Sequence, residues 1–556
     1  MIEVIPLVKA KELVERRFVD SNIPLDELIV REYPEETVFI AHVSKANLAQ
    51  SAEVGNALDR ELHEMGFQGF VTVRTTAHSD VPLLPIKKDA GVADPRAAEL
   101  IALLSARART SETQPSLHYV LDAAANLDKV RSRRHSLVFG RRGAGKTALM
   151  LEAKRSISES GQIAVWLNIQ TYRRESTERT VLWVAARIAD AIITALRSDP
   201  RHVPLQSSAR NIGGQIETLL GQEAVTPTDL HRLIPSIQRL IQRFCESMGK
   251  TLYVFLDDVH YLKRSEQPEL LDLLHSCVRD ADAWLKVAAI RHFANWYKID
   301  PPTGLQAGQD ADAIDLDLTL QQPTKAKAFL EEVLSRFCEY VGVEAISGFY
   351  SPEALDRLVL ASGAVPRDYL VLAANSLVHA RGRGKSKLVG TQDVARAAGD
   401  IAQAKMSELE EDATSTSGSA QRIISGLNRL RDFCLGEHSI TFFQVDFKDK
   451  ERCVEEYSVL ESLMDVRFIH LVNPSVSSRH HAGERSEVYM LDLSQFSGER
   501  LRRHLKVIDF AEGHVILKET GTTNPPRLGN TPRKVISILR SSPQFELRNF
   551  ADKLAR

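Results

Sequence analysis

The chain has 556 residues, of which 43% are hydrophobic and 26% charged, and its formal net charge is -2 at pH 7. That length predicts several domains, and the composition is typical of folded globular protein. The near-neutral charge excludes a protein that is basic overall, so contact with nucleic acid would depend on local patches. The five cysteines form no CxxC pair, which argues against a zinc site or a disulfide scaffold and fits a reducing cytoplasm.

No segment predicts targeting or membrane insertion. Charges run through residues 1–18 without an apolar core, so we expect no signal peptide. The most apolar helical stretch, Val181 to Leu196, contains Arg187 and Asp190 and is too short to span a bilayer. We therefore expect a cytoplasmic protein with no membrane partner.

Residues 1–80 predict a small α/β domain, with a buried strand at 37–43, an amphipathic helix at 50–66 and a second strand at 69–74. This run faintly resembles the opening of TIR domains, some of which cleave NAD. The segment is short for such a domain and offers no candidate catalytic glutamate, so an interaction domain is the better interpretation. Residues 81–114 then predict a linker and a helix.

A glycine-rich loop opens the chemical core, which we place at residues 115–318. The run from Gly140 to Thr147 reads GRRGAGKT and has a short apolar strand before it and a helix after it. Glycines let consecutive backbone N–H groups point at phosphate oxygens, and the helix N-terminus adds its positive end. We expect Lys146 to bridge the β- and γ-phosphates and the Thr147 hydroxyl to ligate Mg²⁺. The predicted nucleotide-binding residues are Gly140, Gly143, Ala144, Gly145, Lys146, Thr147 and Ala148.

An acidic pair follows a second apolar strand, 252–256. Asp257 would hold Mg²⁺, directly or through water, and Asp258 would orient or deprotonate the attacking water. Further short apolar runs at 163–169, 285–290 and 314–318 alternate with helical patterns, which predicts a parallel sheet. The expected fold class is therefore α/β, with the core of a P-loop nucleotide-hydrolysing enzyme.

These motifs resemble those of AAA+-type ATPases near the origin-recognition initiators and the STAND signalling ATPases. The resemblance is carried by GRRGAGKT, by LDDVHYL at 256–262, by the strand ending in Arg291 and by GAVPR at 363–367. It implies ATP and Mg²⁺ as cofactors. It also implies that Arg291 is sensor 1, that Arg367 is sensor 2 in a lid, and that Asn168 restrains the catalytic acid. Each of these three could instead be an ordinary surface arginine or turn cap.

Three departures from the family change the expected activity. The stretch between Lys146 and Asp257 is long, which predicts an inserted helical hairpin near 175–225. The usual catalytic glutamate is replaced by the shorter Asp258. No arginine lies between Arg291 and Arg336, where the family often carries a finger acting on the neighbouring subunit, and Arg279 is a weak substitute. We expect slow hydrolysis, with the nucleotide acting as a switch.

Helical patterns dominate 319–411, which we interpret as a lid, and the polar run 412–419 predicts a linker. Residues 420–515 predict helix, strand, helix and two strands, the order of a winged helix. Residues 516–556 predict a basic tail with a short packing helix near Val535 to Leu539.

The winged-helix segment gives mixed signals for nucleic acid. Its expected recognition helix, 451–465, is acidic and should be repelled by phosphates. Basic clusters at 479–485, with His480 and His481, and in an expected helix at 500–506 could follow a nucleic-acid backbone or an acidic partner, or could be solvated surface charge. The clusters contain Arg479, Arg485, Arg500, Arg502, Arg503 and Lys506.

The leading hypothesis is a Mg²⁺-dependent, slowly hydrolysing AAA+/STAND-like ATPase that switches the positions of core, lid and winged helix. It would engage partner proteins through the N-terminal domain or the tail, by family analogy in a bacterial defence or mobile-element system. The alternative is a DNA-binding initiator or loader ATPase, and a third reading is a P-loop that binds without turnover. The choice of ATP or GTP and a homo-oligomeric state stay open.

Overall fold

The computed structural model describes residues 6–21, 23–32, 37–43, 47–67, 69–75, 87–88, 90–107, 119–120, 125–196, 200–318, 320, 323–384, 387–415, 418–477, 483–496, 504–511, 514–522 and 525–553. The chain divides into two compact units, Met1–Lys87 and Lys88–Arg556. Within the described part of the chain, no helix is both long enough and apolar enough to cross a membrane.

The N-terminal unit is a three-stranded sheet with two helices on one face. Its elements are α1 (Leu7–Asp20), β1 (Leu25–Glu32), β2 (Thr37–Val43), α2 (Leu48–Glu64) and β3 (Gly69–Thr75). Strand β2 is central, antiparallel to β1 and parallel to β3. Phe39, Ala41 and Val43 pack against the helices, as the period of two in a strand requires. The sequence missed α1 and β1, because charged residues interrupt both apolar patterns.

The second unit is built on a five-stranded parallel sheet, which confirms the predicted fold class. Its strands are β4 (His135–Phe139), β5 (Ile163–Asn168), β6 (Leu252–Asp257), β7 (Ala283–Ala289) and β10 (Ala311–Asp315). The order is β10-β4-β7-β6-β5, and every neighbouring pair is parallel. The carboxyl ends of all five strands therefore lie at one edge, where loops from β4, β6 and β7 meet.

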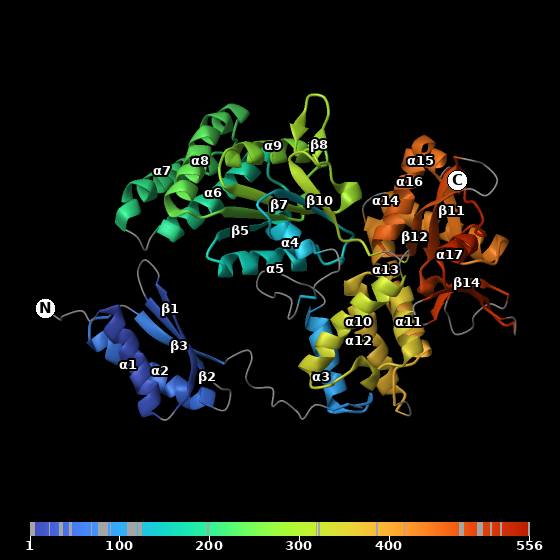
Figure 1. Cartoon of the computed structure of the whole chain (residues 1–556), viewed down its shortest axis with the longest axis horizontal. Helices are drawn as coiled ribbons and strands as arrows, with labels where there is room; N and C mark the ends of the chain where they lie inside the picture. The colour runs from blue at the N-terminus through green and yellow to red at the C-terminus, as the bar shows by residue number, and fades with distance from the viewer. Residues whose placement is uncertain are drawn as a thin grey trace. The chain divides into compact units, whose positions relative to one another are not determined.

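Helices cover both faces of this sheet (Figure 1). One face packs on α4 (Asn126–Arg131) and α5 (Lys146–Glu159), and the other on α6 (Thr177–Leu196), α8 (Pro227–Met248) and α9 (Gln267–Val278). Burial on both sides explains why the strands read as continuous apolar runs. Helix α7 (Val203–Leu220) packs along α6, where the sequence predicts the inserted hairpin.

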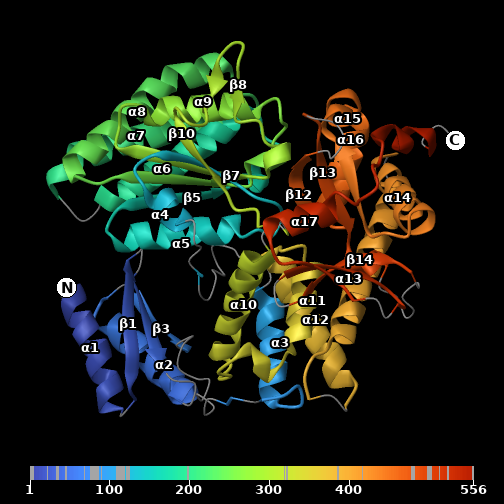
Figure 2. The same ribbon diagram turned by 45° about the vertical axis from the view of Figure 1, so that its right-hand side comes forward.

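The lid core includes a helix from outside the segment 319–411 in which the sequence predicts the lid. Its helices are α10 (Pro323–Tyr340), α11 (Pro352–Ala361), α12 (Pro366–Gly382), α13 (Thr391–Ser415) and, from before the core, α3 (Pro95–Arg107). The helix predicted within residues 81–114 is present as α3, and it packs in the lid core, where Ala97, Leu100 and Leu104 are fully buried. Figure 2 shows α3 among the lid helices. An apolar helix face of this size requires a packing partner.

The C-terminal part begins with the element order expected of a winged helix. Its elements are α14 (Gly418–Arg431), β11 (Phe442–Asp446), α15 (Phe447–Arg452), α16 (Val454–Asp465), β12 (Ile469–Ser477) and β13 (Arg485–Leu491). The three strands form an antiparallel sheet in the order β11-β13-β12. A further sheet of β14 (Lys506–Ala511), β15 (His514–Glu519) and β16 (Arg527–Gly529) follows, with α17 (Pro532–Leu539) after it.

Three sequence expectations in this part need correction. The flexible linker at 412–419 is largely helical, because 412–415 continue α13 and 418–419 begin α14. Lys506 starts a strand that pairs with β15 and does not lie in a helix. The tail at 516–556 is folded into this domain, since Ile538, Leu539 and Phe545 are fully buried. The tail's short packing helix is confirmed as α17.

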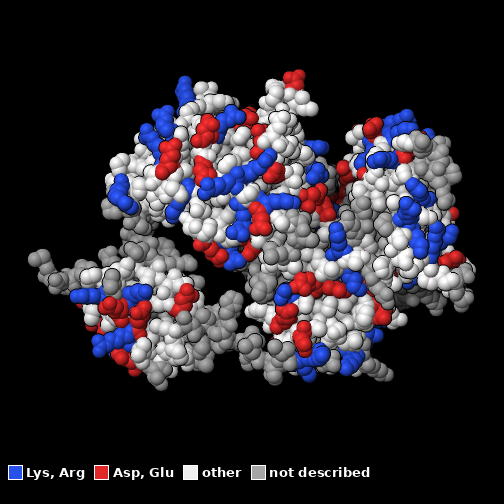
Figure 3. All heavy atoms as spheres, in the orientation of Figure 1, with Lys and Arg blue, Asp and Glu red and all other residues white. Residues whose placement is uncertain are grey.

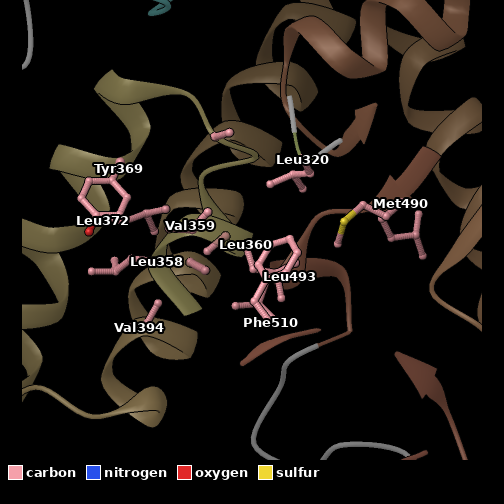
Figure 4. Packing of buried hydrophobic residues seen from close by; sticks show 14 of the residues in the cluster. Leu320, Leu358, Val359, Leu360, Tyr369, Leu372, Val394, Met490, Leu493 and Phe510 are labelled. Atoms are coloured by element: carbon pink, nitrogen blue, oxygen red, sulfur yellow. The ribbon is translucent and has the colours of Figure 1, made fainter. Parts of the chain in front are cut away.

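The lid and the C-terminal domain share one hydrophobic core (Figure 4). Leu360 on α11 lies beside Leu493 and Phe510, and all three are buried. An ion pair of 3.0 Å joins Arg357 to Asp509 across the same boundary. A second pair, between Asp368 and Arg467, joins α12 to the turn before β12. Lid and C-terminal domain therefore form one packed body.

Candidate active site

The glycine-rich loop joins β4 to α5 at the carboxyl edge of the parallel sheet. Gly143 and Gly145 adopt φ values of 86° and 98°, which favour glycine, so the loop can wrap tightly before α5 begins at Lys146. The Lys146 Nζ donates to the carbonyl oxygens of Gly140 at 2.8 Å and Arg141 at 3.1 Å. Burial lowers the pKa of Lys146, while the nearby charges of Asp258 and Asp257 raise it.

Thr147 and Asp257 lie side by side beneath the loop. The Thr147 Oγ1 donates to the Asp257 Oδ2 at 2.7 Å, and Asp257 is fully buried at the end of β6. Burial, and then the charge of Asp258, raise the pKa of Asp257 above its ordinary value. A hydroxyl and a carboxylate are the hard oxygen ligands that Mg²⁺ prefers, and a divalent cation would compensate the buried charge.

These two side chains therefore fit the predicted magnesium ion. Among the described residues, no cluster of three or more His, Cys, Asp or Glu side chains is placed to hold a metal. Mg²⁺ commonly keeps water and phosphate oxygens alongside one or two protein ligands, so Thr147 and Asp257 would share it with the nucleotide. When bound there, the ion would neutralise charge on the phosphates.

Asp258 occupies a different environment from its neighbour. It has a left-handed φ of 60°, and its side chain is 25% exposed. Burial raises its pKa, whereas the charges of Lys146, Arg142 and Arg367 and a hydrogen bond with Asn168 lower it. Burial outweighs these groups, so the pKa of Asp258 lies above its ordinary value in the absence of nucleotide.

Asn168 ends β5 directly beside the acidic pair, since its register partner on β6 is Asp257. Its Oδ1 accepts from the backbone N–H of Gln170 at 2.9 Å and so caps the following turn. The same side chain is hydrogen-bonded to Asp258. Both interpretations of Asn168 are therefore compatible: it caps a turn and also touches the candidate acid.

The two arginines implied by the family resemblance differ in position. Arg291 follows β7, which lies between β4 and β6, so its backbone sits at the correct edge. Its side chain, however, crosses the Phe139 ring at 4.7 Å and pairs with Asp315 at 3.3 Å. In this arrangement it reaches toward β10 and away from Asp258.

Arg367 lies directly on the phosphate loop. Its backbone N–H donates to the Gly143 carbonyl at 3.3 Å. A β-carbon on Gly143 would lie 3.0 Å from the Arg367 Cβ and 3.4 Å from its Nε, so the two chains are in close contact. The Arg367 charge also lowers the pKa of Asp258. The N-terminus of α12 thus brings lid, loop and acid together.

Sequence reasoning missed the two arginines inside the loop itself. Arg141 donates through Nη2 to the carbonyls of Leu318 at 2.6 Å and Gly363 at 3.3 Å, and its Nε donates to Asp317 Oδ1 at 3.3 Å. The Arg142 Nη2 lies 3.4 Å from the Tyr261 hydroxyl. Both occupy variable positions of the motif, and their partners lie far away in the chain, so no local signal could have revealed them.

The assembled site has the chemistry needed for a bound polyphosphate. Lys146, Arg142 and Arg367 supply positive charge around a loop of backbone N–H groups at a helix N-terminus. Asp258 is the acid of the pair after β6 that is accessible and lies near cations. Such a site can bind phosphates, hold a divalent cation and orient a water molecule.

Residues 123–282 match the family model of the AAA ATPase domain. The matched segment contains the phosphate loop, Asn168 and both acids, and it ends just before β7, so Arg291 and Arg367 lie outside it. No curated protein matches the chain.

Several solved structures are similar to the chain at low identity. The Aeropyrum pernix Orc1 protein in complex with DNA is 15% identical, with 74% of this chain and 92% of that chain covered and a TM-score of 0.33. Drosophila ORC bound to DNA is 12% identical, with 64% and 87% covered and a TM-score of 0.27. A Thermotoga maritima RuvB mutant is 12% identical, with 69% and 93% covered and a TM-score of 0.28. At these TM-scores the family assignment rests on the domain match.

Proposed function

We propose that this protein, whose residues 123–282 match the family model of the AAA ATPase domain, is a Mg²⁺-dependent, slowly hydrolysing ATPase whose nucleotide acts as a switch. The resemblance to AAA+ ATPases that the motifs predicted is confirmed by the domain match. The observation that carries the switch is the contact of Arg367 with Gly143, since it joins the phosphate loop to the lid.

Each residue of the site has a separate role in the proposed hydrolysis. The loop amides and Lys146 bind and orient the phosphates, and Asn168 holds Asp258 toward them. Asp258 orients the attacking water and accepts its proton. Thr147 and Asp257 hold the magnesium ion. Arg367, from the lid, contacts the terminal phosphate and so links triphosphate binding to the position of α12.

Movement of the lid would carry the C-terminal domain with it, because the two share one core. The loop already holds the lid turn through Arg141, which donates to the Gly363 carbonyl. Gly363 in turn packs against the His470 ring, so that a β-carbon there would overlap the imidazole. A continuous line of contacts therefore runs from phosphate loop to lid turn to C-terminal domain.

The test compares hydrolysis with movement. Wild type, Lys146→Ala and Asp258→Asn are assayed for phosphate release, and labels at Ser160→Cys and Glu451→Cys, in a Cys453→Ser background, report the distance between core and C-terminal domain. We expect Asp258→Asn to lose about 10²-fold or more in kcat while retaining the ATP-dependent distance change, and Lys146→Ala to lose both.

Three outcomes would overturn this proposal. Equal phosphate release by wild type and Asp258→Asn would leave no catalytic role for that acid. A distance that is identical with ADP and with a non-hydrolysable ATP analogue would remove the switch. A turnover number above about 10 s⁻¹ for the isolated protein would replace a slow switch by a motor.

We propose that partner proteins bind the N-terminal unit or the exposed surface of the C-terminal domain. The folded tail cannot act as a free arm, because its apolar side chains are buried. A bacterial defence or mobile-element system is the setting that family analogy suggests for such a partner, and self-assembly remains part of the same proposal.

A DNA-binding initiator or loader is the second candidate, and one observation favours it. Two arginines lie together at the last described pair of the β12–β13 ladder, since Arg540 donates to the Ser477 carbonyl at 2.9 Å and Ser477 is the register partner of Arg485. Part of the predicted basic surface lies outside the described residues: Arg479, His480, His481, Arg500, Arg502 and Arg503. Against it, α16 is acidic, and Figure 3 shows acidic and basic side chains interspersed on the face drawn.

A gel shift with duplex and single-stranded DNA over a range of salt separates these candidates. Phosphate contacts make affinity fall steeply with salt, so an initiator should bind at about 50 mM salt and release at higher concentrations. Lack of binding at the lowest salt rejects the initiator. Binding that is lost in Arg485→Gln/Arg540→Gln, and kept in Arg239→Gln, supports it.

A further inference from the structure

The two adjacent arginines of the phosphate loop have opposite surroundings. Arg141 is 19% exposed and is held by Asp317 and by two backbone carbonyls. Arg142 is exposed, and among the described residues it makes no ion pair; its one hydrogen-bond partner there is the Tyr261 hydroxyl at 3.4 Å. Arg141 thus fixes the loop, whereas Arg142 keeps an uncompensated charge.

Tyr261 connects the Arg142 guanidinium with the turn that begins at Asp258. The Tyr261 backbone N–H donates to the Asp258 carbonyl at 3.1 Å, which ties the ring to the catalytic turn. Its ring packs against His260 at 4.8 Å, and the His260 Nδ1 lies 3.9 Å from the Asp258 Oδ1. The contact to Tyr261 therefore places the Arg142 guanidinium beside the turn that carries Asp258.

The position of Arg142 in the chain agrees with this placement. Arg142 lies in the loop between Gly140 and Lys146, and its contact with Tyr261 joins the loop to the turn that begins at Asp258. A terminal phosphate bound by Lys146 and attacked by a water on Asp258 must lie between these two residues. The guanidinium is then within reach of the same phosphate.

We propose that Arg142 is a catalytic residue that contacts the terminal phosphate of a nucleoside triphosphate bound to its own subunit, and that Tyr261 is its positioning residue. This inference rests on the proposed ATPase function and deepens it. It also gives this chain a source of positive charge where no arginine occurs between Arg291 and Arg336. A guanidinium suits the role, because its planar fork matches two phosphate oxygens.

The reaction requires no further reactant. The water oxygen forms a bond to the γ-phosphorus, and the bond from that phosphorus to the β–γ bridging oxygen breaks. The electron pair of the broken bond stays on the diphosphate, and the water proton passes to Asp258 and then to solvent. Arg142 neither gains nor loses a proton; it stabilises the negative charge on the transferring group.

The test measures kcat, KM and nucleotide affinity for Arg142→Gln, Arg142→Lys and Tyr261→Phe. We expect Arg142→Gln to lower kcat by at least about tenfold, because arginines contacting this transition state supply large rate factors. Arg142→Lys should recover part of the loss, and Tyr261→Phe should lower kcat by a smaller factor with little change in KM. Arg239→Gln is the matched control, since this arginine is exposed on α8 and remote in sequence from the loop.

A binding readout separates a catalytic role from a structural one. Arg142→Gln should bind a non-hydrolysable triphosphate analogue several-fold more weakly than wild type does. Its affinity for ADP and its melting temperature should equal those of the Arg239→Gln control. If wild type hydrolyses the triphosphate and Arg142→Gln keeps both the wild-type kcat and the wild-type preference for triphosphate over ADP, this inference fails while the proposed function stands. Lack of any nucleotide binding by wild type overturns the proposed function itself.

Discussion

At the scale of single residues, the site separates two adjacent acids. Asp257 is fully buried against Thr147, whereas Asp258 is 25% exposed and faces cations from loop and lid. Environments that push neighbouring carboxylates apart commonly assign them different roles. Here the buried acid suits a cation and the exposed acid suits a water molecule.

The raised pKa of Asp257 predicts proton release when magnesium and nucleotide bind. Burial favours the protonated acid in the free protein, and a cation can bind only the carboxylate. Affinity for the Mg²⁺–nucleotide complex should therefore rise with pH through the raised pKa and weaken below it. Calorimetry in two buffers of different ionisation enthalpy measures the released protons, and Asp257→Asn should release fewer. Equal heats in both buffers would contradict the prediction.

At the scale of elements, the turn between α11 and α12 contacts both neighbours of the lid. Gly363 has a φ of 56°, and its carbonyl accepts from Arg141 while its α-carbon packs on His470. No residue other than glycine fits this position, because a β-carbon would overlap the His470 imidazole. The turn therefore depends on glycine for both conformation and space.

Replacing that glycine should destabilise the protein. We expect Gly363→Ala to lower the free energy of unfolding by about 1–3 kcal/mol, since both backbone strain and overlap oppose it. Combining it with His470→Ala should relieve the overlap and leave the strain. Gly399→Ala is the control, because Gly399 has open space around it within α13 and should be neutral or stabilising. Chemical denaturation measures wild type and the three variants, and equal midpoints for the two single glycine variants would refute the argument.

The elements also show what a sequence can predict here. The phosphate loop and the acidic pair were predictable, because the chemistry requires specific residues at fixed spacing beside apolar strands. The roles of Arg141 and Arg142 were not, since their partners Asp317, Gly363 and Tyr261 come from distant segments. The packing partners of helix α3 and of the tail were not predictable for the same reason: each buries its apolar side against residues far away in the chain.

At the scale of the whole molecule, the lid and the C-terminal domain cannot be separated at the boundary that composition suggests. The polar run 412–419 is mostly helical, and the core passes across it. The N-terminal unit differs, since it has its own core of residues from α1, α2 and the three strands.

Two truncations test this difference. Removing residues 412–556 should expose the apolar surface around Leu358 and Leu360 and give a protein that binds a hydrophobic dye and aggregates. Removing residues 1–87 should leave a second unit with an unchanged melting temperature and nucleotide affinity. A soluble, cooperatively melting protein after the first truncation would show that the shared core is dispensable.

The contacts of Arg141 have a consequence for how the molecule would respond in time. This side chain is hydrogen-bonded to Asp317 and to the Leu318 carbonyl, where the chain leaves β10 for the lid, and also to the Gly363 carbonyl in the lid turn. The phosphate loop is thus hydrogen-bonded directly to the segment that connects the core with the lid. Nucleotide binding would then alter the stiffness of this connection as well as the position of the lid. The core would stay fixed to the lid and C-terminal domain for as long as the triphosphate remains bound, so slow hydrolysis would set the duration of that state.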